Sequence, residues 1–159
     1  MKLFISETKN KGGIPVIVTS TTRRSFDSTG KIANSLGDYP DAARKVAREA
    51  NVALIDLNAM TTDLFNAMGP EDSKKAFVHY PANAFLGMTK AVADNTHFNP
   101  YGAYEIAKCI IEGIKENKLG ITKYLVDGLP SFDPSKPDDV TKFYWPLSPK
   151  SSVVKPDGN

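Results

Sequence analysis

Two side chains that can move protons together lie three positions apart in the segment Asp94-Asn95-Thr96-His97. An imidazole takes up and returns protons near neutral pH, and a carboxylate on its other ring nitrogen fixes the tautomer and stabilises the charged ring. In a tight loop, this spacing lets both side chains reach one point. We therefore expect Asp94 and His97 to form an acid–base pair in a loop that runs directly into a helix.

Two other interpretations of this segment remain open. Asp94 could simply cap a turn through Asn95-Thr96, with His97 as a surface residue near the start of the helix. A metal site would need a third ligand, for which His79 is available. Zinc sites usually have three or four ligands at defined spacing, so we expect no metal here.

Three further residues are candidates for binding a substrate. Arg23 and Arg24 follow the first predicted strand, and guanidinium groups pair bidentately with carboxylates. His79 precedes the Asp94 segment and could line the same site, although an ordinary loop position also explains it. The alternatives for the two arginines are solvation and structural salt bridges to nearby acids, which are Asp27, Asp38 and Asp41.

Apolar spacing along the chain predicts helices separated by two short buried strands. The predicted strands cover residues 14–19 and 52–57, and the predicted helices cover residues 2–11, 38–51, about 60–68 and 99–119. Gly69-Pro70 is expected to end the third helix, and residues 71–98 show no regular pattern. On the last helix the expected buried stripe is Ala103, Ile106, Ala107, Ile110, Ile111 and Ile114.

Composition excludes several classes of protein. The 159 residues fit one domain, and 20 basic against 18 acidic side chains give a net charge of +2, which argues against a nucleic-acid surface. The single cysteine, Cys109, excludes an intrachain disulfide framework and is expected to be a buried thiol. No stretch approaches the roughly 18 apolar residues of a membrane helix, and no signal-peptide pattern follows Met1.

The alternation of helices and buried strands predicts an α/β fold with a parallel sheet. Only two strands are evident, whereas sheets commonly have about four to six strands. The sequence also opens inside a predicted helix. These observations lead us to expect that part of a larger domain is missing on the N-terminal side. Unpaired sheet edges and apolar helix faces would then drive self-association, so we expect a homo-oligomer.

Several blocks together resemble the SGNH (GDSL) hydrolase family, and within it the rhamnogalacturonan acetylesterase-like group. The blocks, which cover roughly residues 1–118, are Gly13-Ile14-Pro15-Val16-Ile17-Val18-Thr19, Arg23-Arg24, Leu54-Ile55-Asp56-Leu57-Asn58 and Asp94-x-x-His97-x-x-x-x-Gly102-Ala103. The resemblance implies a flavodoxin-like three-layer α/β/α sandwich. Residues 1–120 would then be the C-terminal part of such a domain. Their proline content and lack of periodicity make residues 121–159 an expected partly disordered extension, with disorder from residue 150 onward.

The same resemblance implies hydrolysis of acetyl esters on pectin-type polysaccharide, with Asp94 and His97 as part of a Ser-His-Asp triad and no cofactor. The family's Gly-Asp-Ser and Gly-x-Asn-Asp blocks, which bring the nucleophile and the oxyanion hole, do not occur in this sequence. The serine would therefore come from elsewhere. The alternative is a non-catalytic remnant or carbohydrate-binding module. A nucleotide-binding domain is disfavoured because no glycine-rich phosphate loop follows either strand.

The resemblance also suggests partners and a compartment. Substrates would be an acetylated acidic polysaccharide or another small ester, and Arg23 or Arg24 could hold a galacturonate carboxylate. Neither a nucleic acid nor a membrane is expected as a partner. The family suggests a secreted or periplasmic parent protein, whereas the residues after Met1 leave open either a cytosolic protein or a signal that lies upstream.

Overall fold

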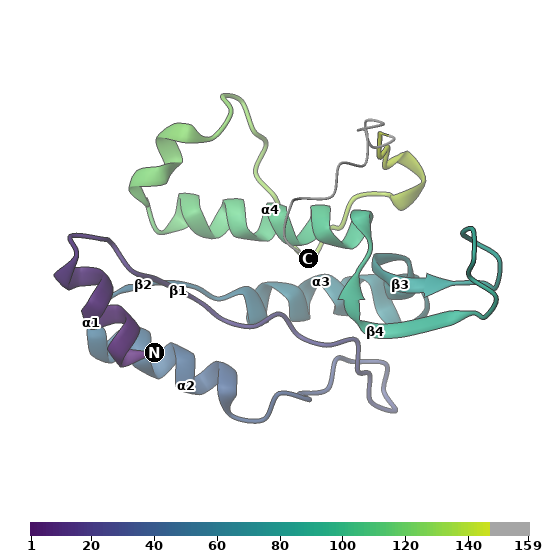
Figure 1. Ribbon diagram of the computed structural model, residues 1–159, viewed down its shortest axis with the longest axis horizontal. Coiled ribbons are helices and arrows are strands. Elements are labelled where there is room, and N and C mark those ends of the chain that lie inside the picture. Colours follow the sequence, from purple (N-terminus) through teal and green to yellow (C-terminus); the bar gives the residue numbers. More distant parts are fainter. Residues whose placement is uncertain (147–159) are drawn as a thin grey trace, which may run out of the picture.

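The computed structural model describes residues 1–146, which form a mixed helix and strand structure with two small sheets (Figure 1). The expected disorder of residues 150–159 lies outside the described residues. The helices are α1 (Lys2–Asn10), α2 (Tyr39–Ala50), α3 (Leu57–Asp72) and α4 (Pro100–Glu116), with 3₁₀ turns η1 (Ser73–Ala76), η2 (Gly120–Tyr124) and η3 (Val140–Lys142). The strands are β1 (Val16–Val18), β2 (Ala53–Ile55), β3 (Phe77–Tyr80) and β4 (Val92–Phe98).

The predicted parallel pairing of the first two strands is confirmed. β1 and β2 run parallel, and they lie between α2 and α4 (Figure 1). The small side chains Ala43 and Ala47 bring α2 close to Ile17. On the other side Gly113 of α4 packs so closely that an added Cβ would lie 2.5 Å from a methyl carbon of Ile55. The α/β class is thus confirmed, and the full sandwich stays a prediction.

Helix α3 differs from its prediction at both ends. It begins at Leu57, because the Asp56 side chain caps it by accepting a hydrogen bond from the Ala59 N–H at 3.3 Å. Gly69 interrupts the helix with a positive φ of 73°, but the chain then resumes helical geometry at Pro70. Proline is tolerated there because the first turn after a break needs no backbone N–H. The predicted break of the helix at Gly69-Pro70 is therefore confirmed, although a further helical turn follows it up to Asp72.

The segment predicted to be irregular contains an antiparallel hairpin, β3–β4. Phe77 pairs with Phe98, but the next residue, Val78, pairs with Asp94, so three residues of β4 bulge out between these pairs. This bulge removes the alternation by which a strand is recognised in sequence. The rings of Phe77 and Phe98 lie 4.9 Å apart, and Phe77 lies equally close to Phe65 of α3, which fixes the hairpin to the core.

Helix α4 begins where predicted, because the side chain of Asn99 accepts a hydrogen bond from the Gly102 N–H at 3.0 Å. Its buried face is only partly the predicted one: Ile114 is buried and Ile106 and Ile110 pack against the core, whereas Ala103 and Ala107 are exposed. The fully or nearly buried residues are Tyr101, Gly102, Glu105, Cys109, Gly113 and Ile114. Because glycine has no side chain, the glycines on this face let the backbone of α4 approach its neighbours more closely than isoleucines would. Packing therefore decided which face of α4 is buried. Cys109 is buried as expected, and burial raises its pKa to about 12.

Part of the C-terminal segment packs along α4. Phe132 and Phe143 are partly buried against the core, whereas Tyr144 and Trp145 are largely exposed. The ammonium group of Lys108 lies 2.7 Å from the buried carboxylate of Glu105 and 2.7 Å from Asp138 in this segment, and 4.0 Å from the ring centroid of Phe132. Burial raises the pKa of Glu105, whereas Lys108 opposes that shift.

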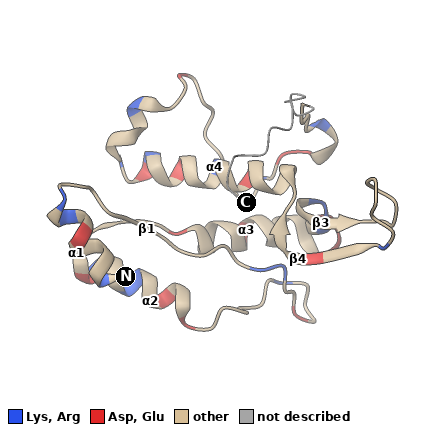
Figure 2. Cartoon of the chain, viewed as in Figure 1, with Lys and Arg blue, Asp and Glu red and all other residues tan. Residues whose placement is uncertain are grey.

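Acidic and basic side chains are interspersed over the described elements, as the balanced composition implies (Figure 2). None of the helices within residues 1–146 is long and apolar enough to span a bilayer.

Candidate active site

The side chains of Asp94 and His97 meet in the bulge of β4, not in a free loop as predicted. His97 Nδ1 lies 2.6 Å from Asp94 Oδ2. The other carboxylate oxygen, Oδ1, accepts hydrogen bonds from the backbone N–H groups of Thr96 at 2.7 Å and His97 at 3.0 Å. Asp94 therefore caps the turn and holds the imidazole at the same time. The bulge supplies the tight turn that the spacing of three residues requires.

This contact leaves the second ring nitrogen of His97, Nε2, available. It makes no hydrogen bond within residues 1–146, and the His97 side chain is 76 % exposed. When Nδ1 donates to a carboxylate, the neutral ring presents Nε2 as an acceptor, which is the form needed to take a proton from a hydroxyl group. The pair thus has the geometry of a general base. Its catalytic role stays a prediction.

The Asp94 carboxylate is held in its ionised form. Its pKa falls to about 2, chiefly because the His97 ring donates to it, and further because the backbone N–H groups of His97 and Thr96 do so. A carboxylate with a lowered pKa contributes stability above its ordinary value of 3.8, and this contribution is lost as the pH falls through about 2. At neutral pH the Asp94 carboxylate is therefore ionised.

We expect the substitution His97→Ala to raise the pKa of Asp94 toward its ordinary value, because it removes the largest cause of the shift. Titration of the carboxyl carbon by ¹³C NMR measures this. Thr96→Ala is the matched control, since Thr96 acts through its backbone N–H, which alanine retains. An Asp94 pKa that stays at about 2 in the His97→Ala variant would contradict the assigned contact.

Asn95 joins two of the predicted binding residues to this pair. Its side-chain oxygen accepts a hydrogen bond from Arg24 Nη1 at 2.9 Å and lies 2.9 Å from His79 Nε2. The backbone N–H of Arg24 also donates to the Asn95 carbonyl oxygen at 3.1 Å. Sequence analysis did not single out Asn95. Arg24 and His79, far apart in the sequence, thus reach the residue that directly follows Asp94.

Arg24 is occupied by structural contacts on its other side as well. Its Nε donates to Ser73 Oγ at 3.0 Å, Nη2 donates to the carbonyl oxygen of Pro70, and the guanidinium lies 5.6 Å from the ring centroid of Phe26. Arg24 therefore ties the loop after β1 to the end of α3 and to β4. Arg23, in contrast, is exposed.

The salt bridges considered for the two arginines are not present among residues 1–146. Asp27 caps its own loop by accepting from the Thr29 N–H at 2.8 Å, and Asp41 pairs with Arg44 at 2.6 Å. The acidic partners suggested for the two arginines are therefore wrong. Arg24 nevertheless has a structural role through its other contacts.

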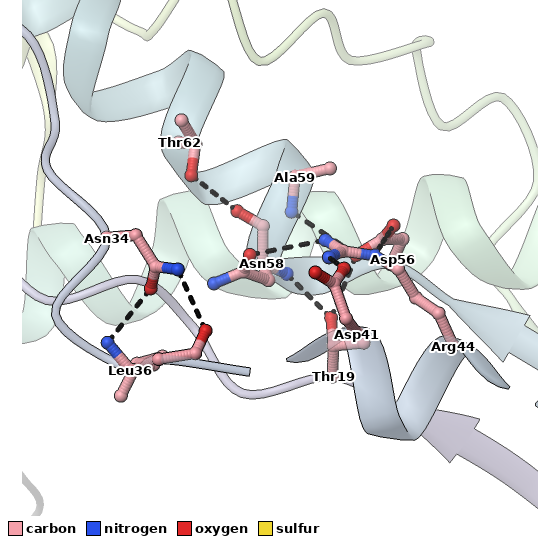
Figure 3. A network of polar contacts seen from close by, with 10 residues as sticks. Thr19, Asn34, Leu36, Asp41, Arg44, Asp56, Asn58, Ala59 and Thr62 are labelled. Carbon is pink, nitrogen blue, oxygen red and sulfur yellow. Dashed lines mark hydrogen bonds and ion pairs between the residues drawn. The ribbon is translucent and has the colours of Figure 1, made fainter. Parts of the chain in front are cut away.

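A second polar network lies at the carboxyl ends of β1 and β2 (Figure 3). Arg44 contacts both oxygens of Asp56, at 2.7 and 2.8 Å, and Thr19 Oγ1 donates to Asp56 Oδ1 at 3.1 Å. Thr19 Oγ1 in turn accepts from the Asn58 N–H at 2.8 Å. Although burial opposes it, these hydrogen bonds lower the pKa of Asp56. The network holds β1, β2, α2 and α3 together. In the sequence, it could have been inferred from the position of Asp56 directly after a buried strand.

No group of three or more His, Cys, Asp and Glu side chains in the described part of the chain is arranged to hold a metal ion. His79, the possible third ligand, instead contacts Asn95. The described residues therefore give no support to a metal at Asp94 and His97.

Comparison with known proteins identifies two related sequences. The chain is 44 % identical over 126 residues to the rhamnogalacturonan acetylesterase RhgT of Bacillus subtilis (strain 168). The chain is related to the rhamnogalacturonan acetylesterases. It is also 31 % identical over 126 residues to the probable rhamnogalacturonan acetylesterase YesY of the same organism. The resemblance to the rhamnogalacturonan acetylesterase-like group of SGNH hydrolases is thereby confirmed.

The extent of these matches is partial. They cover 79 % of this chain but 54 % of each relative, so the chain spans about half the length of the curated rhamnogalacturonan acetylesterases it matches. No family model matches the chain. No solved structure gives a significant match.

Proposed function

We propose that this chain carries the acid–base half of a carbohydrate O-acetylesterase that acts on an acetylated acidic polysaccharide. The observation that carries the proposal is the 2.6 Å contact between His97 Nδ1 and Asp94, with Nε2 exposed, in a chain 44 % identical to a rhamnogalacturonan acetylesterase. The nucleophilic serine and the oxyanion hole come from polypeptide outside these 159 residues, whose sequence lacks a Gly-Asp-Ser block.

In this proposal the residues of the chain move one proton in each of two steps. A serine hydroxyl attacks the acetyl carbonyl while His97 Nε2 accepts its proton, and the imidazolium then gives that proton to the departing sugar oxygen. Water attacks the acetyl-enzyme by the same route, releases acetate and restores the serine. Throughout, Asp94 stabilises the positive ring and keeps Nδ1 protonated. Its lowered pKa ensures that it stays ionised during both steps.

The second candidate function is a non-catalytic module of the same lineage. The absence of a Gly-Asp-Ser block from the sequence and the 76 % exposure of His97 favour it for the chain acting alone. The two candidates differ in whether Asp94 and His97 act on a serine once one is supplied.

The test uses a fluorophosphonate, which labels activated serines, and intact-mass analysis. The isolated chain is expected to give no adduct. A chimaera in which this chain replaces the matching part of RhgT is expected to give one adduct and to release acetate from acetylated rhamnogalacturonan. A folded chimaera without either activity would establish the non-catalytic candidate. An adduct on the isolated chain that disappears in His97→Ala would place the serine within it.

Arg23 and Arg24 are expected to affect this chimaera differently. Arg23 is exposed and free to meet a galacturonate carboxylate, so Arg23→Ala should raise KM for the acidic polysaccharide about tenfold with kcat unchanged. Arg24 holds Asn95 beside Asp94, so Arg24→Ala should instead lower kcat. Steady-state kinetics on the polysaccharide measures both, and a neutral acetyl ester is the control. If Arg23→Ala leaves KM unchanged in a normally folded chimaera, Arg23 has no role in binding substrate.

A further inference from the structure

A pocket lies between the first turns of α4 and the segment that contains and follows η3. It has a volume of about 530 Å³ and is lined by Tyr104 of α4 and by residues 138–139 and 142–146. Figure 1 shows η3 beside the end of α4 that begins at Pro100. Small-molecule sites have volumes of about 300–1,000 Å³, so this pocket is large enough for a ligand. Its lining comes wholly from this chain and includes neither residue of the acid–base pair.

Three aromatic rings follow one another along this pocket. The ring centroid of Phe143 lies 5.3 Å from that of Tyr104 and 6.3 Å from that of Trp145. The planes of Phe143 and Trp145 differ by 26°, because the chain leaves η3 in extended geometry and alternate residues of an extended segment face the same side. Trp145 is 59 % exposed, and Tyr104 is exposed as well. The row of rings is therefore accessible to a ligand.

Contacts with α4 hold this row in place. The ring of Phe143 packs edge-on against Tyr101, with centroids 5.5 Å apart, and the Tyr101 hydroxyl donates to the Asp138 carbonyl oxygen at 2.6 Å. The Lys108 ammonium group lies 2.7 Å from the carboxylates of both Asp138 and the buried Glu105. A site whose residues are fixed beforehand loses less conformational entropy when a ligand binds.

The charged side chains of the lining favour a ligand with hydroxyl groups and without a carboxylate. The lining carries two carboxylates, Asp138 and Asp139, against one ammonium group, Lys142. Hydrogen bonds from the side chain and the backbone N–H of Thr141 lower the pKa of Asp139, so this group is ionised at neutral pH. Carboxylates accept hydrogen bonds from hydroxyl groups and an ammonium group donates them. The excess of negative charge repels an acidic ligand.

We propose that this pocket is a second binding site, which takes a neutral pyranose unit of a polysaccharide. The C–H groups on one face of a pyranose carry slight positive charge and pack on the negative faces of aromatic rings, while its hydroxyl groups reach the charged side chains. The choice of a sugar over other ligands of aromatic sites rests on the proposed function, in which the substrate is a polysaccharide. A uronate unit is excluded by its charge, in contrast to the site proposed for Arg23.

Trp145 is the sole tryptophan of the chain, so its fluorescence reports on this pocket alone. The full chain is titrated with the methyl glycosides of galactose, rhamnose and xylose. Methyl galactosiduronate is the matched acidic ligand, because it differs from the galactoside only at C6. We expect at least one neutral glycoside to change the Trp145 fluorescence with a dissociation constant of about 1–10 mM. The uronate is expected to bind more weakly than the galactoside by about threefold or more.

Variants separate the roles of the rings and of the charge. Tyr104→Ala removes one ring and should weaken binding about tenfold, whereas Tyr104→Phe keeps the ring and should retain binding. Tyr124→Ala is the control, since this tyrosine is 77 % exposed on η2 and lies outside the pocket lining. Asp139→Asn keeps an acceptor for the start of η3 but removes the charge, so the uronate should approach the affinity of the galactoside. Trp145→Ala, followed by ligand-observed NMR, should also weaken binding.

Three results would overturn the inference. The first is that no neutral glycoside binds the folded chain, and the second is that binding persists unchanged in both Tyr104→Ala and Trp145→Ala. The third is that tetramethylammonium binds and the sugars do not, because aromatic rings beside carboxylates would then form a cation site. Binding is measured on the isolated chain, which is expected to be inactive as an esterase. Sugar binding with an inactive RhgT chimaera therefore contradicts only the proposed function, and an active chimaera without sugar binding contradicts only this inference.

Discussion

Replacing His97 with alanine is expected to lower kcat/KM of the RhgT chimaera for an acetyl ester by about 10²- to 10⁴-fold, the contribution of a positioned general base. The physical reason is that the contact of Nδ1 with Asp94, at 2.6 Å, leaves Nε2 as the exposed nitrogen able to take up the serine proton. Hydrolysis of a chromogenic acetyl ester, with fluorophosphonate labelling in parallel, measures the loss.

The matched control is His79→Ala, which removes the other histidine of the chain. His79 contacts Asn95 and not the Asp94 carboxylate, so its loss should lower activity less than tenfold. Asp94→Asn should lower activity strongly, and the double variant with His97→Ala should be little worse than His97→Ala alone, because the pair acts as a unit. Equal effects of the His79 and His97 variants would contradict the assignment of the base.

The substitution Gly102→Ala is expected to destabilise the fold by about 3 kcal/mol, at the upper end of the usual cost of overpacking. An added Cβ would overlap the Ala76 carbonyl oxygen and lie 2.8 Å from its carbonyl carbon. Backbone atoms cannot move aside as a flexible side chain can. The helix α4 and the turn η1 would separate, and η1 leads directly into β3, which pairs with the strand carrying Asp94.

Urea denaturation of the isolated chain measures this loss of stability, and NMR detects displacement of His97 from Asp94. Gly120→Ala is the matched control: no heavy atom lies within 4 Å of its added Cβ, and its φ is not positive. It should change stability by less than about 0.5 kcal/mol. A Gly102→Ala variant as stable as the Gly120→Ala variant would show that the contact between α4 and η1 is looser than described.

Sequence analysis located the Asp94 and His97 contact because it depends on local geometry. A carboxylate three residues before a histidine reaches the ring whenever the backbone turns between them, and Asp94 itself stabilises that turn. The parallel strands were predictable for a similar reason: short β-branched runs between helices fit a buried strand and little else. The helix start at Asn99 depends on a side-chain cap, which is also a local interaction.

The β3–β4 hairpin and the buried face of α4 were decided by tertiary contacts. The bulge of three residues breaks the alternation of β4, and the packing of Phe77 between Phe65 and Phe98 provides the stabilisation that local sequence does not. On α4, hydrophobic spacing favoured the isoleucines, but Gly102 and Gly113 allow closer approach and so set the rotation of the helix.

By itself, then, the sequence determined the features that depend on residues close together in the chain. These are the pair of Asp94 and His97, the two parallel strands and the cap of α4. The sequence also showed the relationship to the acetylesterases. Only the tertiary structure decided that Arg24 and His79 meet at Asn95 and that Asn117 reaches back to the carbonyl oxygen of Leu54. Such contacts join residues far apart in the chain, and each depends on how whole helices and strands pack.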